Sequence, residues 1–359
     1  MKVLFCGGHL TPALAMIDFL QAQQKEVSII FYGREYSSTK EKQLSQEATE
    51  LAKRQVKFVK FNGSRHSLLN LFYVIKAGYL LSQDRPDIFM AFGGYLSLPI
   101  AIACFILKIP VLTHEQTRIA GQSNLFISKF AKKVAISHQS SAKFFPAAKT
   151  VVTGNPLRAQ LLKTAAAPSW AQNLPKNKKL LFITGGNQGS LIINQSVAKL
   201  MSSLVKDWKV IHACGNSTQK SNYQADLEQL RIKLNPTEQK SYLIRAWLTG
   251  EELAWVYQHA SAVISRAGAN TINELLYFSL PSILIPLPFA KGNEQLLNAK
   301  YVADHGGAIL LPQKQLNAAN LSKNLEQLKK YHHSFKEQLV KIKVDSQAAA
   351  KLWQIVSEL

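Results

Sequence analysis

A chain of 359 residues is long for one hydrophobic core and suggests two domains, and its hydrophobic content of 47% is ordinary for a globular protein. Lys and Arg number 43 against 22 acidic residues, and the net charge of +21 divides into +10 for residues 1–157 and +11 for residues 158–359. This even spread argues against a dedicated nucleic-acid module. It fits a protein that works near anionic lipid or phosphorylated substrates, or one from a proteome that is basic throughout.

The cysteines and the apolar stretches indicate whether the chain is a disulfide-bonded, zinc-binding, secreted or membrane-spanning protein. Cys6, Cys104 and Cys214 are few and far apart, which predicts neither a disulfide framework nor a zinc site and favours a reducing cytosol. The N-terminus starts directly on a strand pattern, so we expect no signal peptide. The longest apolar stretch, residues 96–107, is shorter than the ~20 residues that a spanning helix needs. We expect a soluble chain or one that lies on a membrane.

Apolar strand-like runs alternate with helix-length segments along the chain, which predicts an α/β fold with parallel sheets. Two of these runs, residues 2–6 and 179–184, end in a pair of glycines just before a helix, as the first strand of a Rossmann-like domain does. Neither is a full G-x-G-x-x-G, so nicotinamide or flavin chemistry is disfavoured. The predicted strands are residues 3–6, 27–32, 88–92, 111–113, 134–136, 180–184, 210–213, 262–265 and 283–286.

Turn-forming residues place the domain boundary. Gly154-Asn155-Pro156 ends the first domain, predicted as residues 1–157, and the second covers residues 158–346. Residues 165–178, with two prolines, are the expected linker. The last segment, residues 347–359, has a helical apolar pattern.

Residues 68–81 hold eleven apolar or aromatic side chains among fourteen. A helix of this length and composition is usually buried core. Basic residues flank it, however, and they suggest a helix that lies at a membrane interface. The sequence leaves both interpretations open.

Three groups in the first half could carry chemistry. His9 follows the first glycine pair and is either a loop histidine or a general base. His114-Glu115-Gln116 and the segment up to Asn124 follow a predicted strand, where parallel sheets bind ligands, although residues such as Asn124 also cap helices. Arg158, at the domain junction, is either a surface arginine or a clamp for a diphosphate.

The segment 262–298 suits a nucleotide that bears a sugar. An apolar strand runs into small residues that open a helix, where free N–H groups favour phosphate. Glu274, expected in the first turn, could accept from ribose hydroxyls, but Thr271-x-x-Glu274 is also a capping box. Gln295 and Asn298 could bind sugar hydroxyls. The aspartates show no metal-ligand spacing, so we expect neither a metal nor a cofactor.

In this order the motifs resemble the MurG family of peripheral membrane glycosyltransferases. The resemblance covers residues 1 to about 310. The segments that carry it are Gly7-Gly8-His9-Leu10-Thr11-Pro12, Gly93-Gly94-Tyr95-Leu96-Ser97-Leu98-Pro99, residues 114–124, residues 154–158, residues 185–189 with Asn194-Gln195, residues 266–274 and residues 295–299.

The resemblance implies two Rossmann-like domains facing a cleft, the GT-B architecture. It implies inverting transfer of N-acetylglucosamine from UDP-N-acetylglucosamine to undecaprenyl-pyrophosphoryl-MurNAc-pentapeptide (lipid I), which gives lipid II for peptidoglycan synthesis, cell shape and cell division. The implied location is the cytoplasmic face of the cell membrane, on an anionic lipid surface. The C-terminal domain would hold the sugar donor and the N-terminal domain the lipid acceptor. The final helix would pack back on the N-terminal domain.

Roles follow by motif position. His9 is the preferred base, with Glu115 as runner-up, and the acceptor side would hold Gly93, Gly94, Tyr95 and His114. The expected donor-binding residues are Gly7, Gly8, His9, Asn124, Arg158, Asn187, Gln188, Leu248, Ala269, Asn270, Thr271, Glu274, Gln295 and Asn298.

The chain departs from the family pattern at three places. Its first glycine loop is shorter, Asn187 stands where the family usually has Ser, and the segment that holds Leu248, the expected uracil contact, is longer. Three other functions fit a similar fold: a glycolipid synthase that uses diacylglycerol, a non-catalytic UDP-sugar-binding subunit, and a UDP-N-acetylglucosamine 2-epimerase.

Overall fold

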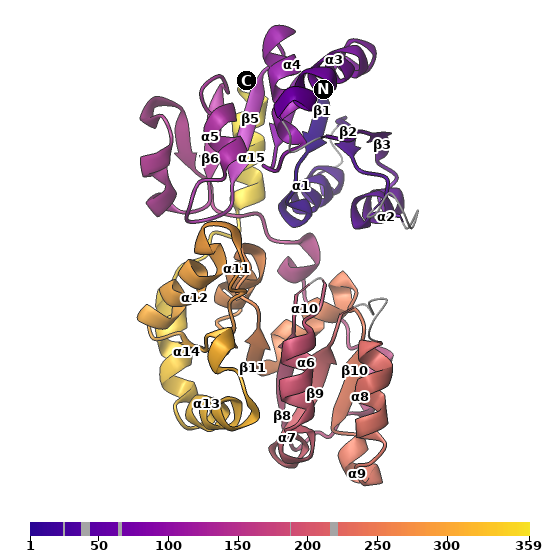
Figure 1. The fold of residues 1–359 in the computed structure, drawn as a ribbon, viewed down its shortest axis with the longest axis vertical. Helices are drawn as coiled ribbons and strands as arrows, with labels where there is room; N and C mark the ends of the chain where they lie inside the picture. Colours follow the sequence, from indigo (N-terminus) through magenta and orange to yellow (C-terminus); the bar gives the residue numbers. More distant parts are fainter. Residues whose placement is uncertain (24–25, 37–43, 64–66, 187, 216–221) are drawn as a thin grey trace. The chain divides into compact units, whose positions relative to one another are not determined.

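The computed structural model describes residues 1–23, 26–36, 44–63, 67–186, 188–215 and 222–359. The chain forms two compact units, one of Met1–Ala159 with Asp345–Leu359 and one of Gln160–Val344 (Figure 1). The first unit therefore contains both ends of the chain. The sequence places the corresponding boundaries at residues 157 and 346.

The first unit is built on a seven-stranded parallel sheet in the order β3-β2-β1-β4-β5-β6-β7. Its strands are β1 (Lys2–Cys6), β2 (Ser28–Gly33), β3 (Lys57–Lys60), β4 (Ile88–Ala91), β5 (Val111–Glu115), β6 (Lys133–Ile136) and β7 (Thr150–Val152). Its α-helices are α1 (Leu10–Ala22), α2 (Gln46–Lys53), α3 (Ser67–Asp84), α4 (Ser97–Ile106), α5 (Gln122–Ile127) and α15 (Ala348–Ser357).

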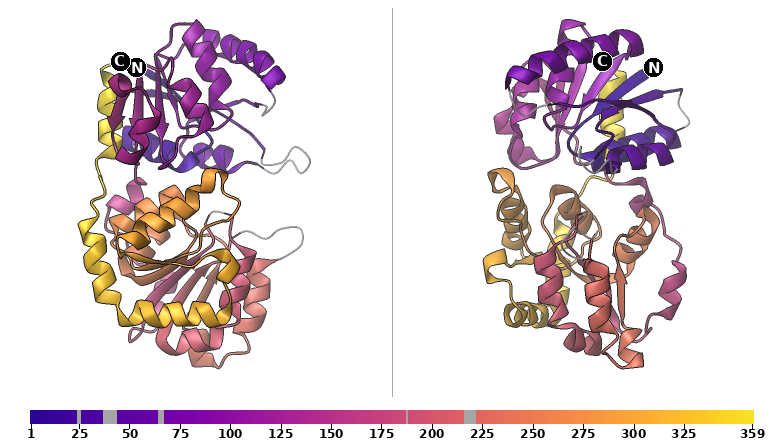
Figure 2. Two further views of the ribbon diagram at one scale, coloured as in Figure 1. Left: turned by 60° about the vertical axis from the view of Figure 1, so that its left-hand side comes forward. Right: turned by 45° about the vertical axis from the view of Figure 1, so that its right-hand side comes forward.

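The central strand β1 contributes side chains to a hydrophobic core on each face of this sheet, because successive side chains of a strand point to opposite sides. Val3 and Phe5 pack with residues of α1 and α15, whereas Leu4 and Cys6 pack with residues of α3 and α4. Helix α15, yellow in Figure 2, contributes Leu352 to the first of these cores. The C-terminal helix is thus an integral part of the first unit.

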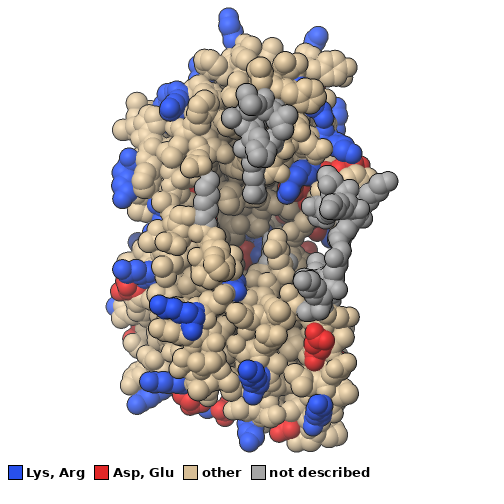
Figure 3. Space-filling model, viewed as in Figure 1, with Lys and Arg blue, Asp and Glu red and all other residues tan. Residues whose placement is uncertain are grey.

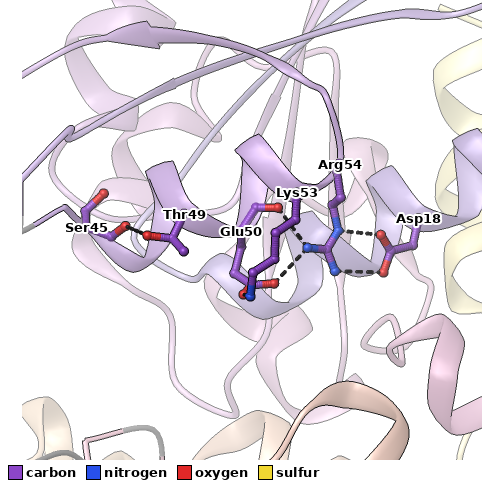
Figure 4. A network of polar contacts seen from close by, with 6 residues as sticks. All are labelled: Asp18, Ser45, Thr49, Glu50, Lys53 and Arg54. Atoms are coloured by element: carbon purple, nitrogen blue, oxygen red, sulfur yellow. Dashed lines mark hydrogen bonds and ion pairs between the residues drawn. The ribbon is translucent and has the colours of Figure 1, made fainter.

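A polar network joins α1 to α2 on the surface of the first unit (Figure 4). The Arg54 guanidinium contacts Asp18 Oδ1 at 2.5 Å and Glu50 Oε2 at 2.8 Å. Ser45 is the N-cap of α2, since its hydroxyl accepts from the backbone N–H of Ala48 at 3.0 Å. The paired charges are only partly exposed, which strengthens such contacts relative to fully solvated ones.

The second unit contains a six-stranded parallel sheet in the order β10-β9-β8-β11-β12-β13. The strands are β8 (Lys179–Thr184), β9 (Trp208–Ala213), β10 (Tyr242–Arg245), β11 (Ala260–Ser265), β12 (Ser282–Leu284) and β13 (Ala308–Leu310). The α-helices are α6 (Leu191–Ala198), α7 (Met201–Asp207), α8 (Tyr223–Arg231), α9 (Pro236–Gln239), α10 (Gly250–His259), α11 (Ala269–Tyr277), α12 (Glu294–Asp304), α13 (Ala318–Lys330) and α14 (His332–Lys341).

The predicted linker is packed onto the second unit through an aromatic contact. Trp170 meets Trp255 edge to face, with ring centroids 5.4 Å apart, and its indole N–H donates to Glu252 Oε1 at 2.7 Å. Both indole rings are buried in the same core as Leu180 and Phe182 of β8. Residues 165–178 therefore contribute to the hydrophobic core rather than forming a free tether.

Both sheets have the strand order of a Rossmann fold, so the predicted class of two Rossmann-like α/β domains is confirmed. In such sheets the strand order reverses at a topological switch point, where successive strands begin to be added on the other side of the first strand. Here that point lies between β1 and β4 in the first unit and between β8 and β11 in the second. Ligands bind outside the carboxyl ends of the strands at this position.

Candidate active site

The switch point of the first unit is formed by two glycine loops that touch. The backbone N–H of Gly8, after β1, donates to the carbonyl of Gly93, after β4, at 2.9 Å. A Cβ atom on Gly94, whose φ is +79°, would lie 2.6 Å from the nitrogen of Gly8. A Cβ on Gly7 would lie 2.6 Å from Cβ of Phe92. Gly7 and Gly94 are therefore required by close backbone approach, and Gly93 is favoured by its φ of +70°.

His9 stands at the N-terminus of α1 and makes no side-chain capping bond. Burial lowers the pKa of its imidazole below the ordinary value, and the charge of Glu115 opposes this shift. The positive end of the helix dipole also disfavours an imidazolium at this position. His9 is therefore neutral near pH 7, as a group that accepts a hydroxyl proton must be.

Glu115 is 2% exposed and accepts four hydrogen bonds. Its Oε1 accepts from the backbone N–H and the hydroxyl of Thr117, at 3.0 and 2.8 Å. Its Oε2 accepts from the backbone N–H of Gly121 at 2.8 Å and from Asn124 Nδ2 at 2.9 Å. A carboxylate held this way organises the loop between β5 and α5, and its acceptor sites are occupied by the protein itself.

Asn124 is buried beside Glu115, with its amide engaged on both sides. Its Nδ2 donates to Glu115 and to the carbonyl of His114 at 3.1 Å, and its Oδ1 accepts from the Thr113 hydroxyl at 2.8 Å. One acceptor site on Oδ1 remains for an outside hydroxyl. The suggestion that Asn124 caps a helix is wrong, because Gly121 is the N-cap of α5 and no side chain caps it.

His114 is 1% exposed and lies beneath the turn that leads to Arg158. Its Nε2 is 3.0 Å from the carbonyl of Gly154, which can only accept, so Nε2 carries the hydrogen. Burial lowers the pKa of His114 to about 4. Arg158 and Tyr95 are half-buried. Gln116, to which the sequence assigns no role of its own, is also buried and donates to the carbonyl of Phe92 at 3.5 Å.

The switch point of the second unit begins with the loop after β8. Gly189 donates its N–H to the carbonyl of Gly186 at 3.0 Å, and a Cβ on Gly185 would lie 2.3 Å from the nitrogen of Ser190. The loop is therefore tight and ends directly at the N-terminus of α6. Gln188 is exposed within it. Asn187, predicted to contact the diphosphate, lies outside the described residues.

Arg266 joins the two loops at this switch point and has no predicted role of its own. It follows β11, is 9% exposed, and donates to the Ser190 hydroxyl at 2.8 Å and to the carbonyl of Ile285 at 3.2 Å. These partners are neutral, so its positive charge is not cancelled by them. Burial lowers the pKa of Arg266 relative to an exposed arginine. An arginine that directly follows a buried strand, with a glycine two residues further on, is the sequence signal for this group.

Gly268, the N-cap of α11, leaves open space at the start of the helix. Its φ of −66° suits any residue, and a Cβ there would meet no atom of the described residues within 4 Å, its two chain neighbours aside. Neither backbone strain nor packing explains this glycine, whereas a ligand lying on the helix N-terminus would. Ala269, Asn270 and Thr271 form the first turn, and all three are half-buried.

Glu274 lies in the second turn of α11, so its predicted place in the first turn is wrong. The capping-box alternative for Thr271 and Glu274 is wrong as well, because no side chain caps α11. Glu274 is 3% exposed and accepts from the Tyr257 hydroxyl at 3.1 Å. The capping boxes of the second unit lie elsewhere, one of them at Thr249 and Glu252 of α10.

Two amides of α12 hold the neighbouring loops. Asn298 is 1% exposed and donates to the carbonyl of Ala267 at 3.1 Å. Gln295 is half-buried, and its Oε1 accepts from the backbone N–H of Leu287 at 3.0 Å. The Leu248 side chain is 6% exposed and packs in the core, so an outside base could contact only its backbone.

Helix α3 has a buried and an exposed apolar side, so the core interpretation of residues 68–81 is right for the buried side, and the membrane interpretation stays a prediction for the exposed side. Ala77 and Leu81 are buried in the core. Helices α4 and α5 also carry exposed apolar side chains, and Phe130 joins them by contacting both Phe105 and Phe126. We call these residues the apolar surface: Leu71, Phe72, Ile75, Tyr79, Phe105, Ile106, Leu107 and Phe126, which are 44–69% exposed.

Charge and helix length add to this description. The Lys129 ammonium lies 5.6 Å from the ring centroid of Phe126, so this cation borders the apolar surface. Elsewhere Lys and Arg are spread over the visible face of each unit (Figure 3). Among the described residues, every helix is too short or too polar to cross a bilayer.

Comparison with known proteins agrees with this architecture. Residues 6–136 match the glycosyltransferase family 28 N-terminal domain and residues 180–352 match the family 28 C-terminal domain. The chain is 31% identical over 371 residues to the UDP-N-acetylglucosamine–N-acetylmuramyl-(pentapeptide) pyrophosphoryl-undecaprenol N-acetylglucosamine transferase of Caldanaerobacter subterraneus subsp. tengcongensis, with 100% of each covered.

Two solved structures share the fold. MurG of Acinetobacter baumannii has a TM-score of 0.74 at 23% identity, over 100% of this chain and 99% of that one. The UDP-GlcNAc 2-epimerase of Neisseria meningitidis, solved with UDP-GlcNAc, has a TM-score of 0.67 at 14% identity, over 100% of both chains. At these identities the structural likeness concerns the fold alone.

Proposed function

Because the chain belongs to glycosyltransferase family 28, among the N-acetylglucosaminyl transferases that it matches over its full length, we propose that it makes lipid II. In this reaction N-acetylglucosamine passes from UDP-N-acetylglucosamine to the muramyl sugar of lipid I, with inversion at the anomeric carbon. The N-terminal unit binds the lipid acceptor and the C-terminal unit binds the sugar nucleotide.

The main support for the proposed donor site is the open space at Gly268. A sugar nucleotide lying on the N-terminus of α11 fills this space, with Ala269, Asn270 and Thr271 against its sugar and phosphates. Arg266 supplies a positive charge whose protein partners are neutral. Arg158 and Gln188 add contacts to the diphosphate, the buried carboxylate of Glu274 takes the ribose, and the backbone at Leu248 takes the uracil.

The reaction is a single displacement. The acceptor 4-hydroxyl attacks the anomeric carbon, its bond to that carbon forms as the bond to the UDP oxygen breaks, and the hydroxyl proton passes to His9. The N-terminus of α6 and the Arg266 guanidinium stabilise the charge that develops on UDP. Glu115 holds the loop that carries Asn124, and His114 supports the turn before Arg158, so both act from beneath the site.

The glycine loops and the apolar surface serve the lipid substrate. Gly93 lies beside His9, Gly94 lies against Gly8, and together with Tyr95 they face the acceptor. The apolar surface lies on anionic lipid at the cytoplasmic face of the membrane, with Lys129 among the cations that attract it.

Transfer of labelled sugar from UDP-N-acetylglucosamine to a short-chain lipid I analogue tests the activity. Diacylglycerol is offered in parallel, and a third sample contains the donor alone. Transfer to the lipid I analogue only is the expected result. Label on diacylglycerol would indicate a glycolipid synthase, conversion of the donor alone would indicate an epimerase, and binding without turnover would indicate a non-catalytic subunit.

Vesicle co-sedimentation tests the membrane surface. We expect the protein to bind phosphatidylglycerol vesicles, and the variants Ile75→Asp and Phe105→Asp to bind them more weakly. Ile232→Asp is the matched control, since Ile232 is also an exposed apolar residue, 61% exposed, but belongs to the second unit. Equal binding by all variants would remove the apolar surface from the proposal.

A further inference from the structure

A buried hydrogen-bonded chain runs from the edge of the second sheet to α6. The Tyr242 hydroxyl of β10 lies 2.8 Å from Nδ1 of His212 on β9, and Nε2 of His212 lies 3.0 Å from Oδ1 of Asn194 on α6. Asn194 Nδ2 donates to the carbonyl of Cys214 at 3.0 Å. His212 is 0% exposed and Asn194 is 3% exposed, so water does not compete for these contacts.

The carbonyl of Cys214 determines which group donates and which accepts at every hydrogen bond of this network. A carbonyl only accepts, so Asn194 must present its NH₂ group there and its Oδ1 to His212. Nε2 of His212 therefore carries the hydrogen, and Nδ1 accepts from Tyr242. Burial keeps His212 in this neutral form by lowering its pKa to about 3. The network thus has one arrangement, which gives Asn194 one orientation.

Asn194 connects this network to the loop after β8. Its backbone N–H donates to the carbonyl of Ser190 at 2.9 Å, which closes the first turn of α6 on the residue bonded to Arg266. At the other end, Cys214 precedes Gly215, and a Cβ on Gly215 would lie 2.2 Å from Cα of Gly189. The His212 network therefore holds both the helix start and the glycine turn.

We infer that His212 is a positioning residue for the donor diphosphate. Through Asn194 it holds Ser190 and the Gly189 turn in the arrangement that presents the backbone N–H groups at the N-terminus of α6 to the phosphates. It touches no substrate itself. The inference rests on the proposed function in one respect, namely that a diphosphate binds this loop. Loss of the network would then weaken contacts to the phosphates and leave contacts to the nucleoside unchanged.

The test compares dissociation constants for UDP and for uridine, measured by isothermal titration calorimetry on the full chain. His212→Leu leaves the Asn194 carbonyl oxygen without its donor. We expect it to weaken UDP binding about tenfold, the cost of about one buried hydrogen bond, with uridine binding changed less than about twofold. His212→Gln, whose amide can still donate to Asn194, is expected to restore most of the UDP affinity.

Two further variants distinguish a selective effect on UDP binding from a general loss of stability. Tyr242→Phe removes one hydroxyl at nearly constant volume and is expected to weaken UDP selectively even if His212→Leu does not fold. Ile211→Ala leaves a cavity in the core on the other face of the same strand, so it is expected to lower the melting temperature. The ratio of UDP to uridine affinity is expected to stay at the wild-type value. Equal weakening of UDP and uridine, or no change, would overturn the role of His212. A wild-type protein that binds uridine but not UDP would instead overturn the proposed diphosphate site.

Discussion

The hydrogen bond of 2.8 Å from the Arg266 guanidinium to the Ser190 hydroxyl crosses the switch point of the second sheet. Ser190 ends the loop after β8, and Arg266 begins the loop after β11, so one side chain joins the two strands between which a Rossmann sheet binds its ligand. The sequence separates these residues by 76 positions. The bond also places a buried positive charge at the N-terminus of α6.

Replacing Arg266 should separate stability from binding. Arg266→Met removes a buried charge whose partners are neutral, so we expect the melting temperature to stay the same or to rise. The same change should raise KM for UDP-N-acetylglucosamine about tenfold or more, because one charge-assisted contact to phosphate is lost. Thermal denaturation and steady-state kinetics measure the two effects. A large fall in melting temperature with an unchanged KM would show that Arg266 is structural.

His9 should control the acid side of the pH–rate profile. Its pKa is lowered by burial, so the imidazole stays neutral from alkaline pH down to below its ordinary value. We expect kcat/KM to be level near pH 7 and to fall only at lower pH, as His9 gains a proton. His9→Ala should lower kcat by about 10²-fold or more while donor binding changes little. A rate within a few-fold of wild type would exclude His9 as the base.

Glu115→Gln distinguishes a loop organiser from a base. The amide would turn an NH₂ group toward one pair of donors, either those of Thr117 or those of Gly121 and Asn124. We expect a loss of about 1–3 kcal/mol in stability and a lower rate whose pH profile keeps the wild-type shape. Disappearance of the acid limb in this variant, with the limb retained in His9→Ala, would assign the base to Glu115 instead.

The strands that the sequence predicts are the inner strands of both sheets. An inner strand is covered on both faces and therefore reads as a continuous apolar run. The strands that the sequence does not predict are β3, β7, β10 and β13, which are the four sheet edges in the described chain. Edge strand β3 has the sequence KFVK with both lysine positions exposed, and β13 has three residues. A segment with charged ends such as β3 carries no continuous apolar run, whereas β13 is as short as the predicted β12 and its length alone does not set it apart.

Site residues could be predicted as far as they depend on local pattern. The glycines after β1, β4 and β8 lie at the switch points because a strand–glycine–helix sequence has few other uses in a parallel sheet. The position of Glu274 within its helix could not be read correctly, since the helix starts at Ala269 and not near Thr271. The network of Tyr242, His212 and Asn194 joins two strands and a helix, and no local pattern encodes such a contact.

Buried neutral histidines should make both units sensitive to acid. The pKa is about 4 for His114 in the first unit and about 3 for His212 in the second, both below the ordinary value. Between these values and about pH 6.5, the unfolded chain takes up protons that the folded chain does not, so the free energy of unfolding falls as the pH falls. At pH 5 each histidine costs its unit about 2 kcal/mol relative to pH 7.

Urea unfolding at pH 7 and pH 5, followed by circular dichroism, measures this effect. His212→Gln should make the second unit less sensitive to pH, because the group that titrates on unfolding is gone. His333→Gln is the matched control, since it replaces a histidine whose side chain is 89% exposed. Midpoints that coincide at the two pH values would mean that His114 and His212 take up protons equally in the folded and the unfolded chain.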